Sequence, residues 1–233
     1  MEGKDIFYFK SGNKYEGEFV NNYFCGQGIF YYKNGDKYTG EFNKGLFEGK
    51  GKMIFVNGDS FEGEYKNGKR NGYGIYKYYI IPYRNDIYEG EYKDNKMHGK
   101  GKYYYTNRGE KYIGDYINGL KEGKGIYYYA NGDRYEGDYK NDHSNGKGIY
   151  YFANGDRYKG DIKNTYLEGK GIFYFKDGTR YEGDFKRDKR DGQGIFYYNN
   201  GDKEIGNFSN NKKIGTHILI SKDLELVSID YQN

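Results

Sequence analysis

The sequence predicts an all-β protein, built as an elongated single-layer antiparallel meander of stacked β-hairpins. Three observations support this class. A Tyr-x-Gly string recurs about every 23 residues, the residues around it alternate in polarity with period two, and Asn-Gly turns separate the segments. No segment has helical spacing, so we expect no helix longer than about four residues.

Internal repetition organises the whole chain. Units with a length of 23 residues dominate, although the third has 27 and the fourth has 24. The units begin at Tyr15, Tyr38, Phe61, Tyr88, Tyr112, Tyr135, Tyr158 and Tyr181. We therefore expect one array over residues 1–233, with a partial repeat at 3–14, eight repeats at 15–203, and a degenerate repeat with a C-terminal cap at 204–233.

The unit at residues 135–157, YEGDYKNDHSNGKGIYYFANGDR, predicts two strands. YEGDY alternates large apolar and acidic residues around a glycine, and GIYYF is rich in residues that suit a pleated surface. NDHSNG between them predicts a polar loop. Asn154-Gly155 predicts a type I′ turn, which needs a positive φ at both residues. Connections this short require antiparallel neighbours.

Positions in each unit are numbered from the Tyr or Phe of the Tyr-x-Gly string. Positions 1, 3 and 5 share one face, where glycine at position 3 lets a ring lie flat over the backbone. Position 4 is acidic in all eight units and points the other way. Equivalent acids lie two strands apart, about 9.5 Å, which is too far to share one metal ion. We expect basic residues on adjacent strands to pair with them: Lys37, Arg134, Arg157 and Arg180.

The composition argues against several functional classes. Only 35% of the residues are hydrophobic, and the 38 basic and 34 acidic residues alternate in sign, which favours a solvated surface over a nucleic-acid footprint. Cys25 is the only cysteine, and the three histidines, His98, His143 and His217, form no cluster with it. We find no catalytic constellation and no cofactor or metal motif, so the prediction is a protein that is not an enzyme.

Residues 61–76, FEGEYKNGKRNGYGIY, closely match the pattern YEGEWKNGKRHGKGVYTYADG of one family. The chain resembles MORN-repeat proteins (membrane occupation and recognition nexus) over residues 3–219, with Tyr or Phe in place of the usual Trp. In the ninth unit Gly215-Thr216-His217 replaces Gly-x-Gly, so we expect the regular array to end there. The resemblance implies stacked hairpins with a non-catalytic scaffold or adaptor function.

That resemblance also implies partners and a location. We expect a cytoskeletal or ciliary component, axonemal or radial-spoke-like, that binds other proteins and lies in the cytoplasm with the cytoskeleton or cilium. The N-terminus has no signal-peptide core, and no apolar run reaches the ~18 residues of a membrane span. The alternative is a peripheral phospholipid-binding module at a membrane contact site. Basic loops such as Lys69-Arg70 would make weak contact with anionic lipid, unless they are only solvated.

Position 17 supplies the main candidate binding residues. It falls on the face opposite positions 16 and 18, where intra-sheet packing cannot cover every ring. An exposed tyrosine stripe is typical of a protein-recognition surface. The candidates are Tyr31, Tyr104, Tyr128, Tyr151, Tyr174 and Tyr197.

Two irregular segments add further candidates. In the third unit four extra residues enter at 79–86 with the only proline, which cannot donate to a strand ladder. Its apolar residues Ile80, Ile81 and Tyr83 either fold back over the aromatic face or form an exposed, partner-specific epitope. At the C-terminus, residues 218–229 predict a hairpin around Ser221-Lys222-Asp223 that caps the sheet or forms a homodimer contact.

Overall fold

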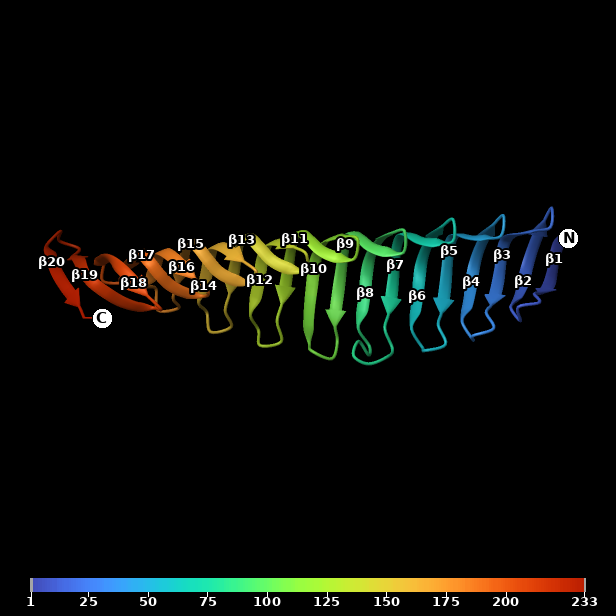
Figure 1. Cartoon of the computed structure of the whole chain (residues 1–233), viewed down its shortest axis with the longest axis horizontal. Helices are drawn as coiled ribbons and strands as arrows, with labels where there is room; N and C mark the ends of the chain where they lie inside the picture. Colours follow the sequence, from blue (N-terminus) through green and yellow to red (C-terminus); the bar gives the residue numbers. More distant parts are fainter. Residues whose placement is uncertain (1, 233) are drawn as a thin grey trace. The chain divides into compact units, whose positions relative to one another are not determined.

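The computed structural model describes residues 2–232, which hold twenty strands and no helix (Figure 1). The chain forms two compact units, Met1–Leu120 and Lys121–Asn233. Within each unit every strand pairs antiparallel with the next strand in sequence. The prediction of an all-β antiparallel hairpin meander is therefore confirmed.

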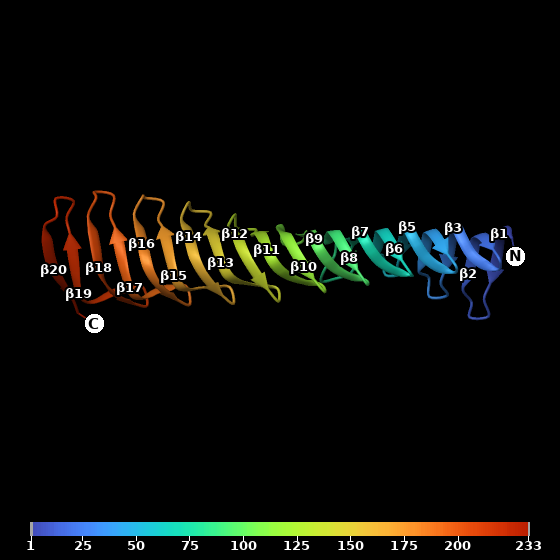
Figure 2. The same ribbon diagram turned by 90° about the horizontal axis from the view of Figure 1, so that it is seen from above.

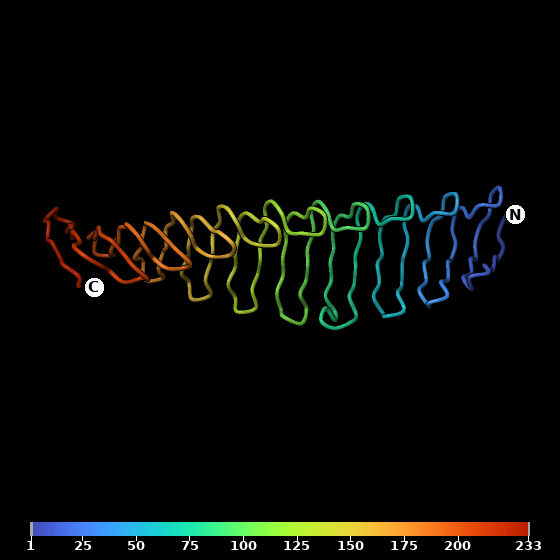
Figure 3. Tube along the Cα trace, in the orientation of Figure 1, coloured from blue at the N-terminus to red at the C-terminus, as the bar shows by residue number. Residues whose placement is uncertain are grey.

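Unit 1 is a sheet in which the trace runs up and down along the chain (Figure 3). Pairing is continuous from the first strand to the tenth. The strands are β1 (Gly3–Tyr8), β2 (Lys14–Val20), β3 (Tyr23–Tyr31), β4 (Lys37–Asn43), β5 (Leu46–Ile54), β6 (Ser60–Lys66), β7 (Lys69–Lys77), β8 (Ile87–Lys93), β9 (Lys96–Tyr105) and β10 (Glu110–Ile117).

Unit 2 repeats the same pattern, and Figure 2 shows its strands side by side. Here too each strand pairs with its successor. The strands are β11 (Leu120–Tyr128), β12 (Arg134–Lys140), β13 (His143–Tyr151), β14 (Arg157–Lys163), β15 (Tyr166–Tyr174), β16 (Arg180–Lys186), β17 (Lys189–Tyr197), β18 (Lys203–Ser209), β19 (Lys212–Ile220) and β20 (Leu226–Tyr231).

The turn with two positive φ values lies at the other connection of the unit, not at Asn-Gly as predicted. At Asn154-Gly155 only Gly155 has positive φ, 97°, and the Gly155 amide donates to Phe152 O, as in a type I turn followed by a left-handed glycine. The turn with two positive φ values lies at positions 7 and 8, for example Asn141 (48°) and Asp142 (68°). The expected polar loop NDHSNG is therefore only this two-residue turn, and β13 begins directly after it at His143.

The two glycines of each Gly-x-Gly have separate structural roles. The first, such as Gly26 with φ 59°, lies at a β-bulge, where a Cβ would meet the carboxylate of Glu18 at 2.2 Å. The second, such as Gly28, lies beneath the Tyr15 ring, where a Cβ would come within 2.5 Å of the ring hydroxyl. Both roles explain the motif without a bound phosphate.

The core consists of aromatic rings on one face of each sheet, chiefly those at positions 1 and 5 of each repeat. The ring at position 1 is fully buried in the eight regular repeats except for 1% exposure at Phe61. Tyr15 stacks on Phe24 at 3.9 Å and meets Phe19 and Phe42 edge to face at 5.3 and 4.9 Å. Since Phe42 belongs to the next repeat, each repeat completes the burial of its neighbour's ring.

Side-chain hydrogen bonds also join successive repeats at the turns. In the Asn-Gly-Asp turns the aspartate accepts a bond from an amide of the following turn, as Asp36 does from Val56 and Asp133 from Ala153, both at 2.8 Å. The turn asparagine donates to the same aspartate, as Asn34 does to Asp36 at 2.9 Å. The aspartate at the third position of this turn thus accepts a hydrogen bond from a backbone amide at the corresponding turn of the next repeat.

Strand pairing continues through the ninth unit. β18 and β19 pair with the register shift of a regular repeat, between Ile205 and Asn207, and β20 then pairs with β19 from Ile220↔Leu226 to Gly215↔Tyr231. The expectation that the regular array ends at Gly215-Thr216-His217 stays a prediction, because the pairing continues there but Glu204 and His217 depart from the repeat pattern. The predicted C-terminal hairpin is confirmed.

Candidate protein-interaction surfaces

The second face of each sheet, opposite the aromatic core, carries positions 2, 4, 13, 15, 17 and 23. The acid at position 4 accepts the amide of position 13 that the bulge leaves without a strand partner, as in Asp184 to Gln193 at 3.0 Å and Glu41 to Lys50 at 3.0 Å. The same acid also pairs with the position-13 lysine of the preceding repeat, as Asp138 does with Lys124 at 2.5 Å.

The predicted basic partners of these acids are wrong. Lysines at position 13 pair with them, namely Lys100 with Asp115, Lys124 with Asp138, Lys147 with Asp161 and Lys170 with Asp184. Lys37, Arg134, Arg157 and Arg180 lie instead over tyrosine rings at position 17. The strand register is the reason. Position 23 lies directly opposite position 17 on the neighbouring strand, whereas the acid at position 4 lies several residues further along its own strand.

The basic side chains at position 23 cover part of the predicted tyrosine stripe. The guanidinium carbon lies 4.2 Å from the Tyr151 ring centroid for Arg134, 4.3 Å from Tyr174 for Arg157, and 4.0 Å from Tyr197 for Arg180. All six candidate tyrosines are half-buried, whereas the sequence predicted an exposed stripe.

The six tyrosines do not form one continuous stripe. Tyr128, Tyr151, Tyr174 and Tyr197 follow one another in unit 2 on alternate strands. In unit 1, Tyr31 and Tyr104 are separated because repeats 2 and 3 carry Ile54 and Lys77 at position 17. Lys14 Nζ lies 4.1 Å from the Tyr31 ring centroid, and Tyr104 pairs with Ile87 and Lys111 in the sheet.

A groove with a volume of about 790 Å³ lies on the second face of unit 1 where these tyrosines are missing. Its lining mixes glycine backbone with acidic and basic side chains, and Lys52 Nζ pairs with Glu62 at 3.1 Å. At one wall the Tyr73 hydroxyl donates to Glu89 at 2.5 Å, and this hydrogen bond raises the pKa of Tyr73 to about 12. The groove is polar and close to charge-balanced, so it favours no particular ligand class.

The irregular connection at 79–86 leaves the sheet between β7 and β8, where Figure 3 shows an extra curl. Both alternatives for this segment are partly realised. Tyr83 turns back toward Tyr78, with ring centroids 5.7 Å apart, yet Tyr83 remains 50% exposed. Ile80 and Ile81 project further, with 48% and 81% exposure, so an apolar knob lies in solvent.

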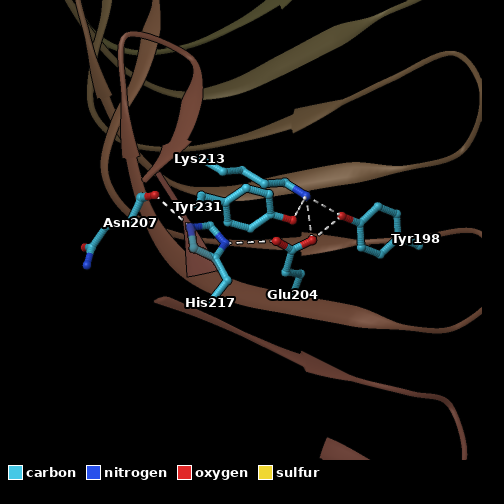
Figure 4. Close-up of polar contacts among 6 residues, drawn as sticks. All are labelled: Tyr198, Glu204, Asn207, Lys213, His217 and Tyr231. Carbon is cyan, nitrogen blue, oxygen red and sulfur yellow. Dashed lines mark hydrogen bonds and ion pairs between the residues drawn. The ribbon is translucent and has the colours of Figure 1, made fainter. Parts of the chain in front are cut away.

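A buried polar cluster in the ninth repeat has no counterpart in the other eight (Figure 4). Glu204 replaces the core tyrosine of position 1, and His217 replaces the glycine of position 14. The His217 ring lies over Gly206, where a Cβ would come within 2.2 Å, and its Nε2 donates to Asn207 O at 2.8 Å. Tyrosine makes the same contacts in regular repeats, where Tyr158 donates to Asp161 O at 2.8 Å. An imidazole from the opposite strand therefore substitutes for the phenol ring.

Glu204 fills the rest of this space and is 2% exposed. Its Oε1 lies 2.9 Å from His217 Nδ1 without the alignment of a hydrogen bond, and its Oε2 accepts from Lys213 Nζ at 2.6 Å. Lys213 also reaches the hydroxyls of Tyr198 at 3.0 Å and Tyr231 at 3.2 Å, so the cluster fastens β20 to the sheet. Burial opposes ionisation of Glu204, but the bonds from Lys213, Tyr198 and Tyr231 outweigh it and lower the pKa of Glu204.

Because the folded-state pKa of Glu204 is lowered, its ionised form stabilises this repeat above the ordinary pKa of 4.5, and that contribution is lost as pH falls. We expect wild type to exceed Glu204→Gln in stability at pH 7, with the difference shrinking below about pH 4.5. The free energy of opening of β18 and β19, measured by amide hydrogen exchange, tests this. Glu204 is surrounded by Lys213, Tyr198, His217 and Tyr231. If the stability difference between wild type and Glu204→Gln grows as the pH falls, its pH dependence does not come from ionisation of Glu204.

The C-terminal hairpin exposes apolar side chains beside this cluster. Leu224, Leu226 and Val227 are 78%, 70% and 51% exposed. Among residues 2–232 there is no group of three or more His, Cys, Asp or Glu side chains that could hold a metal ion. The same part of the chain contains no helix long and apolar enough to cross a membrane.

Sequence reasoning missed two features of these surfaces. The stacking of position-23 cations on position-17 rings was detectable, because Arg134, Arg157 and Arg180 precede Tyr-x-Gly in three successive units where position 17 is also Tyr. Glu204 and His217 each break the repeat pattern, and the sequence shows these as two unrelated exceptions. Only the strand register places the two side chains in one pocket.

Comparison with protein families gives a direct match. The MORN-repeat model matches residues 15–37, 38–60, 61–79, 88–110, 112–134, 135–157, 158–180 and 181–203. No curated protein sequence matches the chain.

Among solved structures, similar chains include the TCP10 domain of Danio rerio CPAP in complex with a peptide of Danio rerio STIL. It shares 11% identity, with 99% of this chain and 100% of that chain covered, at a TM-score of 0.49. Another is the SAS-4 TCP domain of Drosophila melanogaster in complex with a proline-rich motif of Ana2, with 12% identity, 98% and 90% coverage, and a TM-score of 0.23.

Proposed function

Because the chain belongs to the MORN-repeat family, we propose that it is a non-catalytic protein-binding scaffold, associated with the cytoskeleton or cilium. The observation that carries the proposal is the apolar knob formed by Ile80, Ile81 and Tyr83, which projects from the irregular connection between β7 and β8 and is 48–81% exposed. Burying such a knob against a partner removes apolar surface from water, which favours binding.

The surroundings of the knob favour recognition over a packing role. Its base is held by backbone hydrogen bonds, from Asn85 N to Tyr78 O at 2.8 Å and from Tyr78 N to Asp86 O at 3.0 Å. Asp86 itself is buried and accepts the Thr106 amide at 2.9 Å, so the loop ends are tied to the next repeat. A fixed base with an apolar tip presents its side chains with little loss of entropy on binding.

Replacing residues 80–84 by a plain Asn-Gly turn is expected to leave the fold and thermal stability nearly unchanged and to weaken partner binding. The reason is that the removed side chains are largely in solvent. Affinity capture with mass spectrometry from the native source identifies the partners of wild type, and the same capture with the variant measures their loss. Imaging of the tagged chain tests the cytoskeletal or ciliary location.

Val56→Ser is a matched control, since Val56 lies 69% exposed at an ordinary turn of the preceding repeat. It should retain the partners that the loop variant loses. A stability loss of several kcal/mol in the loop variant would mean that the segment packs against the sheet, and the epitope proposal would fail.

Light scattering on the same samples tests the homodimer contact expected at the C-terminal hairpin.

A further inference from the structure

An alternating row of arginine and tyrosine crosses the second face of unit 2, one residue from each successive strand. Register pairs place Arg134 opposite Tyr151, Tyr151 opposite Arg157, and so on across β12 to β17, which lie side by side in Figures 1 and 2. The row is Tyr128, Arg134, Tyr151, Arg157, Tyr174, Arg180 and Tyr197, followed by Lys203. Its arginines recur every second strand, or about 9.5 Å.

The guanidinium groups in this row are held in place but not paired. The guanidinium groups of Arg157 and Arg180 lie over the rings of Tyr174 and Tyr197. Among residues 2–232, no hydrogen bond or ion pair engages either side chain, whereas Arg134 has one long contact with Glu136 at 3.8 Å. The N–H donors at the edges of Arg157 and Arg180 are therefore available and already oriented.

The residues beside the arginine row determine the sign of the charge that a ligand should carry. Beside the arginine row, isoleucines at position 15 alternate with position-2 residues, as Ile149 with Lys159 and Ile172 with Glu182. The next row is neutralised, because each acid at position 4 pairs with a lysine. Arg157, Lys159, Arg180 and Lys203 outweigh Glu182 and leave an excess of positive charge beside the isoleucines. This combination suits carboxylates on a partly apolar chain.

We propose that this Arg/Tyr row binds an extended acidic segment of a partner protein, with carboxylates at every third residue. In an extended polyproline II conformation the chain has three residues per turn and rises about 3.1 Å per residue, so every third side chain points the same way and the repeat of about 9.3 Å matches the spacing of successive arginines. Each carboxylate accepts from one stacked guanidinium, and the residues between them lie on the isoleucine strip. This inference rests on the proposed scaffold function and names the chemistry of one partner.

The test uses the full chain and three synthetic peptides of one length. The first has Glu at residues 2, 5 and 8 among Ser and Ala, the second has the same composition with the three Glu adjacent, and the third has Gln in place of Glu. We expect the first to bind best by fluorescence polarisation and the third not to bind. The double variant Arg157→Gln/Arg180→Gln should lose at least about tenfold in affinity, since charge-assisted hydrogen bonds are removed.

Lys163→Gln/Lys186→Gln is the matched control, because both lysines are exposed at strand ends and the same charge is lost. It should stay within about twofold of wild type. Equal binding of the spaced and clustered peptides, equal loss in both double variants, or no binding at all would overturn the proposal. So would arginine-dependent binding of phosphatidylserine vesicles without peptide binding. If the peptides do not bind as expected but partners are still captured through residues 80–84, only the acidic-segment proposal fails and the scaffold proposal stands.

Discussion

Tyr158→Ala is expected to lower the free energy of opening of its repeat by about 3–5 kcal/mol, the usual cost of truncating a buried aromatic residue. Tyr158 is fully buried in a sheet with one layer, so nothing behind it can collapse into the space. Its ring lies on Gly160 and Gly171 and meets Phe185 of the next repeat edge to face at 5.0 Å. Amide hydrogen exchange along β14 to β17 measures the effect.

Tyr158→Phe is the matched control. It removes only the hydroxyl that donates to Asp161 O, so a loss of about 1 kcal/mol is expected. Phe61 occupies the same position in the third repeat and shows that the site accepts a ring without a hydroxyl. If alanine and phenylalanine cost the same, ring burial is not what holds the repeats together. The loss should also reach β16, since Phe185 loses its partner.

Glu204→Tyr is expected to destabilise the ninth repeat by about 3–5 kcal/mol, and His217→Gly added to it should restore most of that loss. Alone, the new ring would compete with His217 for the space over Gly206 and leave Lys213 without its carboxylate. Together the two changes recreate the tyrosine-over-glycine arrangement of the other repeats. A double-mutant cycle, with opening of β18 to β20 as the measured quantity, gives the coupling energy.

His217→Gly alone should also be costly, because it leaves the buried Glu204 carboxylate beside a cavity. A coupling energy of several kcal/mol is the expected result. If the two single effects simply add, the imidazole does not take the place of the phenol ring. Glu204→Gln is a further control, since it keeps the shape and removes only the charge.

The repeat itself made most of the fold predictable. A 23-residue period with alternating apolar positions dictates two short antiparallel strands per unit, and the glycine at position 3 predicts a ring lying over the backbone. The type I′ turn predicted at Asn-Gly was wrong because that dipeptide is compatible with both a type I′ turn and a type I turn followed by a left-handed glycine.

The candidate site was less predictable, and the ion pairs show why. The sequence indicated that the position-4 acids pair with bases, but two sets of bases lie within reach of that face. In the unshifted register between successive repeats the position-13 lysines lie directly opposite the acids, as Lys170 does opposite Asp184, and the position-23 arginines lie opposite tyrosines, as Arg180 does opposite Tyr174. Strand register has no signature in composition or charge.

The sequence alone determined the β-class, the repeat boundaries, the antiparallel order and the split of each strand into an aromatic and a polar face, because these follow from local periodicity. Only the tertiary structure decided which side chains meet across strands. It stacked Arg157 on Tyr174, placed the His217 ring where a tyrosine belongs, and left Ile81 in solvent. Those outcomes depend on register, bulges and burial, which are set by packing between segments distant in sequence and not by any one of them.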